Sequence, residues 1–189
     1  MKSPLSIAVF CSAAEDLAPK YYEQTTSLGH WIGKQGWRLV YGGASLGLME
    51  CIAHAAKETG ATITGVVPDK LIERNIVSTL LDENIPVHSL GERKEVMLRE
   101  SDLFIALPGG LGTLDEVFHV LGESSIGYHS KPMILYNING CWDSLLNMID
   151  DLRHQGLLRH DLSKRLILAN SLADIHNFID SWMFNKDKQ

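Results

Sequence analysis

The sequence predicts an α/β fold in which one domain, residues 1–189, is built on a doubly wound parallel sheet. Two observations indicate this class. Short apolar runs alternate with amphipathic stretches from one end of the chain to the other, as in successive βα units. The apolar runs lack polar alternation, so each predicted strand is expected to be covered by helices on both faces. No internal repeat or linker divides the chain, and its length suits one domain.

Three strands and two helices are predicted in the first part of the chain. The strands are short, mostly apolar runs at residues 5–11, 37–41 and 61–67. The helices have apolar residues three and four positions apart and occupy residues 21–34 and 48–59. Pro68 closes the third strand, and residues 69–84 are expected to form a long loop with some helix.

The same alternation continues to the end of the chain. Further strands are predicted at residues 85–90, 103–107, 132–136 and 165–169. Further helices are predicted at residues 93–101, 113–122, 142–155 and 172–184. Residues 103–107 are apolar at every position, which is typical of a strand buried on both faces.

The composition excludes several classes of protein. A net charge of −6 argues against a nucleic-acid partner, because such proteins usually carry a basic face. No apolar run is long enough to span a membrane. Cys11, Cys51 and Cys141 do not form a disulfide pattern, so we expect a cytoplasmic protein. The eight histidines are dispersed, so no metal site is expected.

Two glycine-rich turns follow predicted strands, where open α/β sheets bind their ligands. The first, residues 42–47, contains Gly43, and the second, residues 108–113, leads into a helix expected to begin near Thr113. Glycines let backbone N–H groups approach an anion, and a helix start adds unpaired donors. Neither turn matches a dinucleotide fingerprint or the loop of nucleoside-triphosphate hydrolases. The sequence therefore predicts a monophosphate site.

The second turn also has a purely structural interpretation. Thr113 and Glu116 have the spacing of a capping box, in which each side chain bonds to the other's backbone N–H. Glu116 would then only stabilise a helix. The glycines upstream favour ligand binding, because a cap does not need several of them.

The basic stretch from Arg93 to Arg99 also has two interpretations. Glu95 and Arg99 are four residues apart and could form an exposed helical ion pair. Arg93 and Lys94 are less well explained in this way, because cations near a helix start oppose its dipole. A bound anion would offset that cost. Cys11, at a strand end, is predicted to be a packed small residue.

Residues 108–116, P-G-G-L-G-T-L-D-E, resemble the P-G-G-x-G-T-x-x-E signature of the Lonely Guy family of cytokinin riboside 5′-monophosphate phosphoribohydrolases. The resemblance extends to V-F-C at residues 9–11, to Y-G-G and G-L-M within residues 41–49, and to the R-K pair at 93 and 94. The order and spacing of these motifs agree with the family pattern over almost the whole chain. Proteins of this family have often been labelled lysine decarboxylases, but no lysine here has a recognisable pyridoxal-phosphate context.

The resemblance implies a Rossmann-like fold, a homodimer with its site near the subunit interface, and no metal or cofactor. It implies hydrolysis of AMP or N6-modified AMP, a small-molecule nucleoside monophosphate, to free base and ribose 5-phosphate. Arg93 and Glu116 match the catalytic positions, Glu116 to orient or deprotonate water and Arg93 to bind phosphate or steady the leaving base. The expected substrate-binding positions are Gly43, Lys94, Arg99, Gly109, Gly110, Leu111, Gly112, Thr113, Leu114 and Asp115.

The chain departs from the family pattern in the part expected to hold the base. Ser12-Ala13-Ala14 replaces G-S-S, and Ala44 replaces a third glycine. Residues 122–125 read G-E-S-S instead of T-W-A-Q, and Asn75 replaces a glutamate of plant members. The base preference therefore stays open. The alternative function is a non-catalytic carrier of a nucleotide or of a ligand of the molybdenum-cofactor type.

Overall fold

The computed structural model describes residues 4–158 and 165–186, and within them seven strands form one parallel sheet. The strand order is β4-β3-β2-β1-β5-β6-β7. Every neighbouring pair is parallel, which confirms the predicted fold class. The strands are β1 (Ser6–Phe10), β2 (Arg38–Tyr41), β3 (Thr62–Pro68), β4 (Glu83–Val87), β5 (Leu103–Ala106), β6 (Met133–Tyr136) and β7 (Leu166–Ala169).

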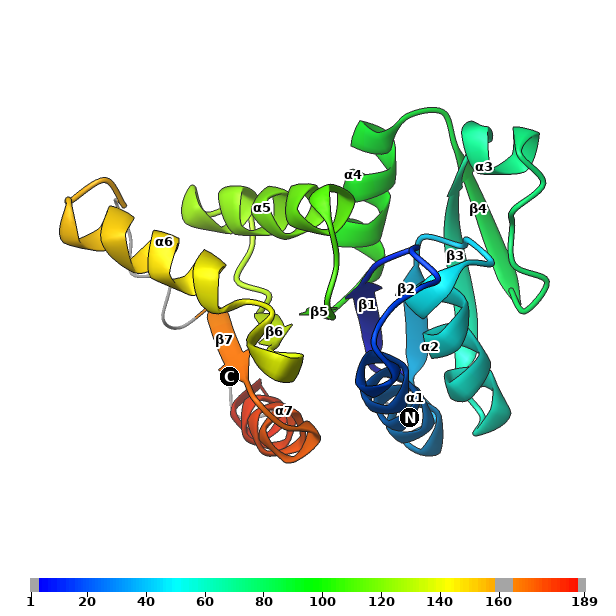
Figure 1. The fold of residues 1–189 in the computed structure, drawn as a ribbon, viewed down its shortest axis with the longest axis horizontal. Helices are drawn as coiled ribbons and strands as arrows, with labels where there is room; N and C mark the ends of the chain where they lie inside the picture. Colours follow the sequence, from blue (N-terminus) through cyan, green and yellow to red (C-terminus); the bar gives the residue numbers. More distant parts are fainter. Residues whose placement is uncertain (1–3, 159–164, 187–189) are drawn as a thin grey trace.

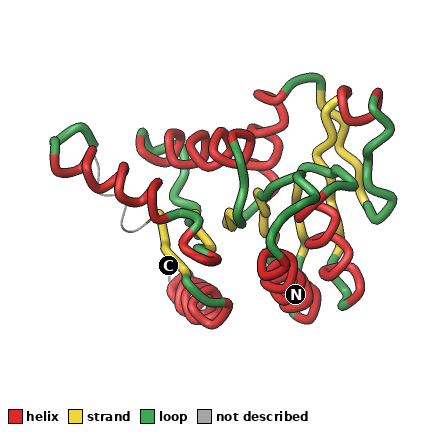
Figure 2. The backbone as a smooth tube through the Cα atoms, in the orientation of Figure 1, coloured by secondary structure: helices red, strands yellow, loops and turns green. Residues whose placement is uncertain are grey.

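Helices cover both faces of this sheet. Figure 1 shows α4 and α5 on one side of the strands and α1, α2 and α7 on the other, and Figure 2 shows the same layers by type of structure. The N-terminal part of α6 packs into the same hydrophobic cluster as α4 and α5. The helices are α1 (Pro19–Lys34), α2 (Gly47–Glu58), α3 (Asp69–Glu73), α4 (Leu90–Glu100), α5 (Leu111–Ser125), α6 (Asp143–His154) and α7 (Leu172–Lys186), with a short 3-10 turn, η1 (Ile138–Gly140), before α6.

The side chains of β1 explain why the sheet needs two helical layers. Ile7 and Val9 point into the core cluster beneath α1 and α2. Ala8 and Phe10 alternate with them and point into the cluster beneath α4 and α5. All four are buried. The absence of polar alternation in the sequence thus correctly indicated strands covered on both faces.

Several predicted boundaries differ from the structure by one to three residues, and those near the starts of α4 and α5 matter most for the site. Helix α4 begins at Leu90 rather than residue 93, because the Ser89 hydroxyl accepts from the Glu92 backbone N–H at 3.1 Å and caps the helix. Strand β4 ends at Val87, three residues before the predicted end, so that Ser89 is free to cap. Helix α5 begins at Leu111, before the predicted start at residue 113. The predicted loop at 69–84 contains α3 and the start of β4.

The sheet reverses its winding direction at β1, which pairs with β2 on one side and β5 on the other. The connection after β1 leads to α1 on one face, and the connection after β5 leads to α5 on the opposite face. Loops that leave adjacent strands toward opposite faces open a crevice at the carboxyl ends of those strands. This topology places the candidate site beyond β1 and β5.

Candidate active site

A cavity of about 280 Å³ lies at this switch point. It is formed by the end of β1 and the loop after it, the turn between β2 and α2, and one face each of α2, α4 and α5. All five segments come together only in the folded chain. The lining residues are Val9, Phe10, Cys11, Ser12, Ala13, Gly42, Met49, Arg93, Gly110, Gly112, Thr113 and Glu116.

One end of the cavity is the start of α5. Gly110 is the N-cap residue and has no side chain that could bond to the helix start. The first helical hydrogen bond runs from the Leu114 N–H to the Gly110 carbonyl at 3.0 Å. The N–H groups of Leu111, Gly112 and Thr113 therefore precede the ladder and need another acceptor. Three such donors, with the positive end of the helix dipole, suit an anion such as a phosphate.

The capping-box interpretation of Thr113 and Glu116 is wrong. Thr113 is the third residue of α5 and is buried, so it cannot be the residue that caps the helix. A Cβ at Gly109 would lie 2.0 Å from the Thr113 hydroxyl oxygen, so Gly109 gives Thr113 the room to pack. Glu116 lies one turn further on and lines the cavity.

Glu116 and Arg93 face each other inside the cavity. The Arg93 Nη2 atom lies 3.4 Å from Glu116 Oε1, and their side chains are only 14% and 12% exposed. The pKa of Glu116 is raised from 4.5 to about 7, chiefly because burial disfavours its charged form. Arg93 lowers that pKa, Asp115 raises it and Lys94 lowers it. A carboxyl group poised near neutrality is suited to exchange protons with a substrate or water.

Cys11 lies on the floor of the same cavity and is buried, as predicted for a packed residue. Burial is the main reason that the pKa of its thiol is raised well above the usual value, and the nearby Glu116 carboxylate adds to the effect. Nucleophilic attack requires the thiolate form. The structure therefore gives Cys11 the properties of a wall residue and not of a nucleophile.

Lys94 and Asp115 are brought together at the edge of the cavity but do not line it. The Lys94 Nζ atom bonds to Asp115 Oδ1 at 2.7 Å, which joins α4 to α5. The Leu111 side chain is 86% exposed, so its expected contribution to binding comes from its backbone N–H. Leu114 packs against the hydrophobic cluster under α5.

Gly43 takes part in the turn and not in the cavity wall. Its φ of +74° is a conformation that favours glycine, and a Cβ there would meet Val67 at 2.5 Å. Its neighbour Gly42 lines the cavity instead. The first glycine-rich turn therefore contributes to the site through a different residue from the one predicted.

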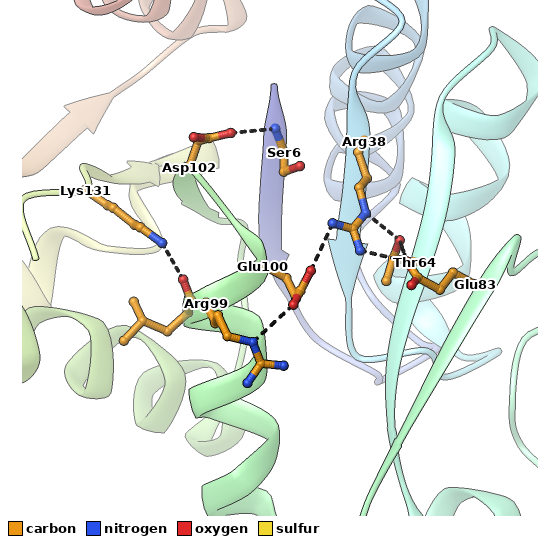
Figure 3. A network of polar contacts seen from close by, with 9 residues as sticks. Ser6, Arg38, Thr64, Glu83, Arg99, Glu100, Asp102 and Lys131 are labelled. Atoms are coloured by element: carbon orange, nitrogen blue, oxygen red, sulfur yellow. Dashed lines mark hydrogen bonds and ion pairs between the residues drawn. The ribbon is translucent and has the colours of Figure 1, made fainter. Parts of the chain in front are cut away.

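Arg99 is not brought to the cavity. Figure 3 shows it in a polar network at the opposite, amino-terminal edge of the sheet. Its Nε donates to Glu100 Oε1 at 3.2 Å, and Glu100 accepts from Arg38, the first residue of β2. No bond joins Arg99 to Glu95 in the described chain, so neither the binding role nor the exposed-pair interpretation matches its position.

The family pattern includes the loop after β1 and Met49, but their residues are not among the expected site residues. Ser12 and Ala13 line the cavity because β1 is the strand at which the winding reverses. The expected position of ligands at strand ends applied to this loop as well, but it has no glycines to draw attention to it. Met49 lies in the first turn of α2 and is the last residue of the G-L-M match.

Within residues 4–158 and 165–186, no group of three or more histidine, cysteine or acidic side chains could hold a metal ion. In the same part of the chain, no helix has the length and apolar character needed to cross a membrane.

Known proteins resemble this chain over most of its length. A family model described as "Possible lysine decarboxylase" matches residues 49–179. A protein from Rhodococcoides fascians named cytokinin riboside 5′-monophosphate phosphoribohydrolase is 37% identical over 171 residues, which cover 90% of this chain and 86% of that protein. The chain belongs to the Lonely Guy family. A Lonely Guy protein from Oryza sativa subsp. japonica, with the same name, is 36% identical over 89% of this chain and 70% of its own.

Solved structures confirm the Rossmann-like fold of this Lonely Guy protein. The molybdenum cofactor binding protein from Rippkaea orientalis has a TM-score of 0.73 at 27% identity, over 97% of this chain and 99% of that chain. The molybdenum cofactor carrier protein from Chlamydomonas reinhardtii has a TM-score of 0.73 at 25% identity, over 96% and 99%.

Proposed function

We propose that this Lonely Guy protein hydrolyses the N-glycosidic bond of a nucleoside 5′-monophosphate, giving the free base and ribose 5-phosphate. One observation carries the proposal. A helix start with three unpaired N–H donors and a buried carboxyl group with a pKa of about 7 share the same cavity. The relatives named as phosphoribohydrolases of a nucleoside monophosphate support this reaction class.

The start of α5 binds the 5′-phosphate in this account. The N–H groups of Leu111, Gly112 and Thr113 donate to phosphate oxygens, as anions are commonly bound at helix starts. Gly110 and Gly112 carry no Cβ, and a Cβ added at either would meet nothing within 4 Å. Both stand at the open surface where the phosphate would enter.

Glu116 acts on the water that attacks the sugar. The bond between C1′ and the base nitrogen breaks, its electron pair leaves with the base, and positive charge develops on the ribose. The ionised Glu116 stabilises that charge and accepts a proton from the water that adds to C1′. The base takes up a proton, so one water molecule is consumed for each bond broken.

Arg93 supplies a fixed positive charge 3.4 Å from the Glu116 carboxylate. It keeps more of Glu116 ionised at neutral pH, since it lowers the pKa of that carboxyl group. The same guanidinium is placed to bind a phosphate oxygen or to stabilise charge on the departing base. The family model's description as a lysine decarboxylase has no counterpart among the residues that line the described cavity, because none is a lysine.

A second candidate is a carrier that binds a nucleotide-like ligand without reacting with it. The likeness to molybdenum cofactor binding and carrier proteins favours it. A carrier requires the anion site of α5 but not a buried, proton-exchanging carboxyl group beside it. Glu116 therefore favours the enzyme.

The test is incubation of the pure protein with a panel of nucleoside 5′-monophosphates, with and without N6 substituents, followed by measurement of free base. Base release with the whole chain supports hydrolysis, and the fastest substrate defines the base preference. Tight binding without base release would instead support the carrier function.

A homodimer is part of the proposal. Leu111, Phe118 and Ile126 are exposed apolar residues seven and eight positions apart on α5 and at its C-cap, and Tyr128 follows just beyond. These spacings place the three residues on one side of the helix. An exposed apolar surface of this kind is typical of a protein interface. A cytoplasmic location stays a prediction from the dispersed free cysteines.

A further inference from the structure

The Arg93 guanidinium lies directly over the backbone of Gly42. A Cβ added at residue 42 would stand 1.6 Å from Arg93 Nη2 and 2.7 Å from its Cζ. It would also stand 2.4 Å from the terminal methyl of Met49. No side chain can occupy this place while the guanidinium remains in it.

Space alone accounts for glycine at residue 42. Its backbone is not in the left-handed region, whereas the next residue, Gly43, has a φ of +74°. An alanine at residue 42 would therefore not be strained by a left-handed backbone conformation. The absence of a side chain at residue 42 therefore leaves room for the Arg93 guanidinium.

Few polar contacts hold Arg93 where it is. Its Nε is buried and has no hydrogen-bond partner among the described residues. Its Nη2 is 3.4 Å from Glu116, longer than a well-formed hydrogen bond. The guanidinium crosses from α4 to the turn after β2, so its position is set mainly by what it packs against there.

We propose that Gly42 is a positioning residue: because it has no side chain, the Arg93 guanidinium can pack over its backbone and lie beside Glu116. The inference rests on the proposed function, in which Arg93 acts on the substrate and on Glu116. It assigns the first glycine-rich turn a task other than phosphate binding.

A methyl group at residue 42 would displace Arg93 without unfolding the protein. The atoms that it meets are the ends of two flexible side chains, Arg93 and Met49, and not backbone. They can rotate away while β2 and α2 stay in place. A displacement of about 1 Å in a catalytic group can cost roughly a hundredfold in rate.

The experiment compares Gly42→Ala, Arg93→Ala and the double variant in the nucleotide hydrolysis assay. Gly91→Ala is the matched control, because Gly91 is exposed on α4 and a Cβ there would meet only the Ser89 hydroxyl oxygen, at an ordinary contact distance of 3.7 Å. We expect Gly42→Ala to lose activity by about a hundredfold with a wild-type circular dichroism spectrum. The double variant is expected to be no worse than Arg93→Ala, because residues that act through one group are not additive.

The pH profile separates positioning from a general loss of structure. Arg93 and Lys94 from α4, Asp115 from α5 and Cys11 after β1 are the titratable or charged groups facing Glu116. Loss of the nearby positive charge raises the pKa of Glu116. The acidic limb of kcat/KM should therefore move to higher pH in Gly42→Ala and in Arg93→Ala alike, and should not move in Gly91→Ala.

The outcomes distinguish the inference from the function on which it rests. A folded Gly42→Ala with wild-type activity, or one whose loss adds fully to that of Arg93→Ala, overturns the positioning role. If Gly42→Ala is unfolded, Gly42 is needed for folding and not for the position of Arg93, and the inference fails. Wild-type activity in Arg93→Ala would instead contradict the proposed role of Arg93.

Discussion

Arg93 and Glu116 come from two helices on the same face of the sheet, and their Nη2 and Oε1 atoms lie 3.4 Å apart in the cavity at the switch point. They are 23 positions apart in the sequence, yet the reversal of winding at β1 brings α4 and α5 side by side. The pair combines a fixed positive charge with a carboxyl group whose pKa is about 7.

Removing the charge of Glu116 should abolish most of the activity. Glu116→Gln keeps the size of the side chain but cannot accept a proton, so turnover should fall by at least about a hundredfold. Initial rates of base release measure this. Glu95→Gln, on the exposed side of α4, is the matched control and should keep wild-type rates. Near-normal hydrolysis by Glu116→Gln would refute the assignment.

The activity should depend on pH through the ionisation of Glu116. Its carboxylate is the active form, so kcat/KM should rise as pH increases through about 7 and then level off. The pH profile of kcat/KM for the wild-type protein, measured over substrate concentrations from below KM to saturation, tests this. A rate that stays flat from acid to neutral pH would show that another group, or none, supplies the base.

The free energy of unfolding should also depend on pH, but the contribution of Glu116 to it should fall as pH rises, whereas the activity rises. The folded-state pKa of Glu116 is about 7, above its ordinary value of 4.5, so its stabilising contribution is present below the ordinary value and lost as pH rises through 7. The Glu116→Gln variant has no carboxyl group at this position, so its stability does not change with pH for this reason. The free energy of unfolding of the variant, relative to wild type, should therefore increase by up to about 3 kcal/mol from acid to alkaline pH. Denaturant titrations at both ends measure the change, and parallel curves would contradict it.

The backbone N–H of Leu111 should bind phosphate independently of its side chain. Leu111→Pro removes this donor, and proline fits the first helical position after the extended Gly110. The KM for a 5′-monophosphate should rise by about ten- to a hundredfold, as expected for a lost bond to a charged group. Leu111→Ala loses the same side chain but keeps the N–H, so its KM should lie well below that of Leu111→Pro. Equal KM values for the two variants would place the phosphate elsewhere.

The exposed apolar residues of α5 should form the subunit interface. The wild-type chain is expected to have the mass of a dimer by light scattering at micromolar concentration. Phe118→Asp puts a charge into the centre of this surface and should give a monomer. A monomeric wild type would contradict the proposed dimer.

The fold could be predicted because strands such as β5 and β6 are continuous apolar runs, which a parallel sheet covered on both faces can bury. The position at which α5 begins could not be predicted in this way. Thr113 and Glu116 have the spacing of a capping box, but Gly110 occupies the cap position and leaves the N–H groups free. Local sequence gives the capping residue types, whereas the loop from β5 decides which residue takes the position.

The membership of the site was predictable only in part. Arg93 and Glu116 carry the family pattern and do meet in the cavity. Arg99 lies on the same predicted helix but at its other end, beside the amino-terminal edge of the sheet, where it bonds to Glu100. The choice between Gly42 and Gly43 depends on which of the two backbones faces α4, a packing relation that no local pattern contains.

The most direct test is the stoichiometry of products formed from a single nucleoside 5′-monophosphate by the wild-type chain. We predict that free base and ribose 5-phosphate appear in equal amounts, and that the matching nucleoside without phosphate is cleaved far more slowly. If the nucleotide is recovered intact from a stable complex with the protein, the account of Glu116 as a catalytic group is contradicted.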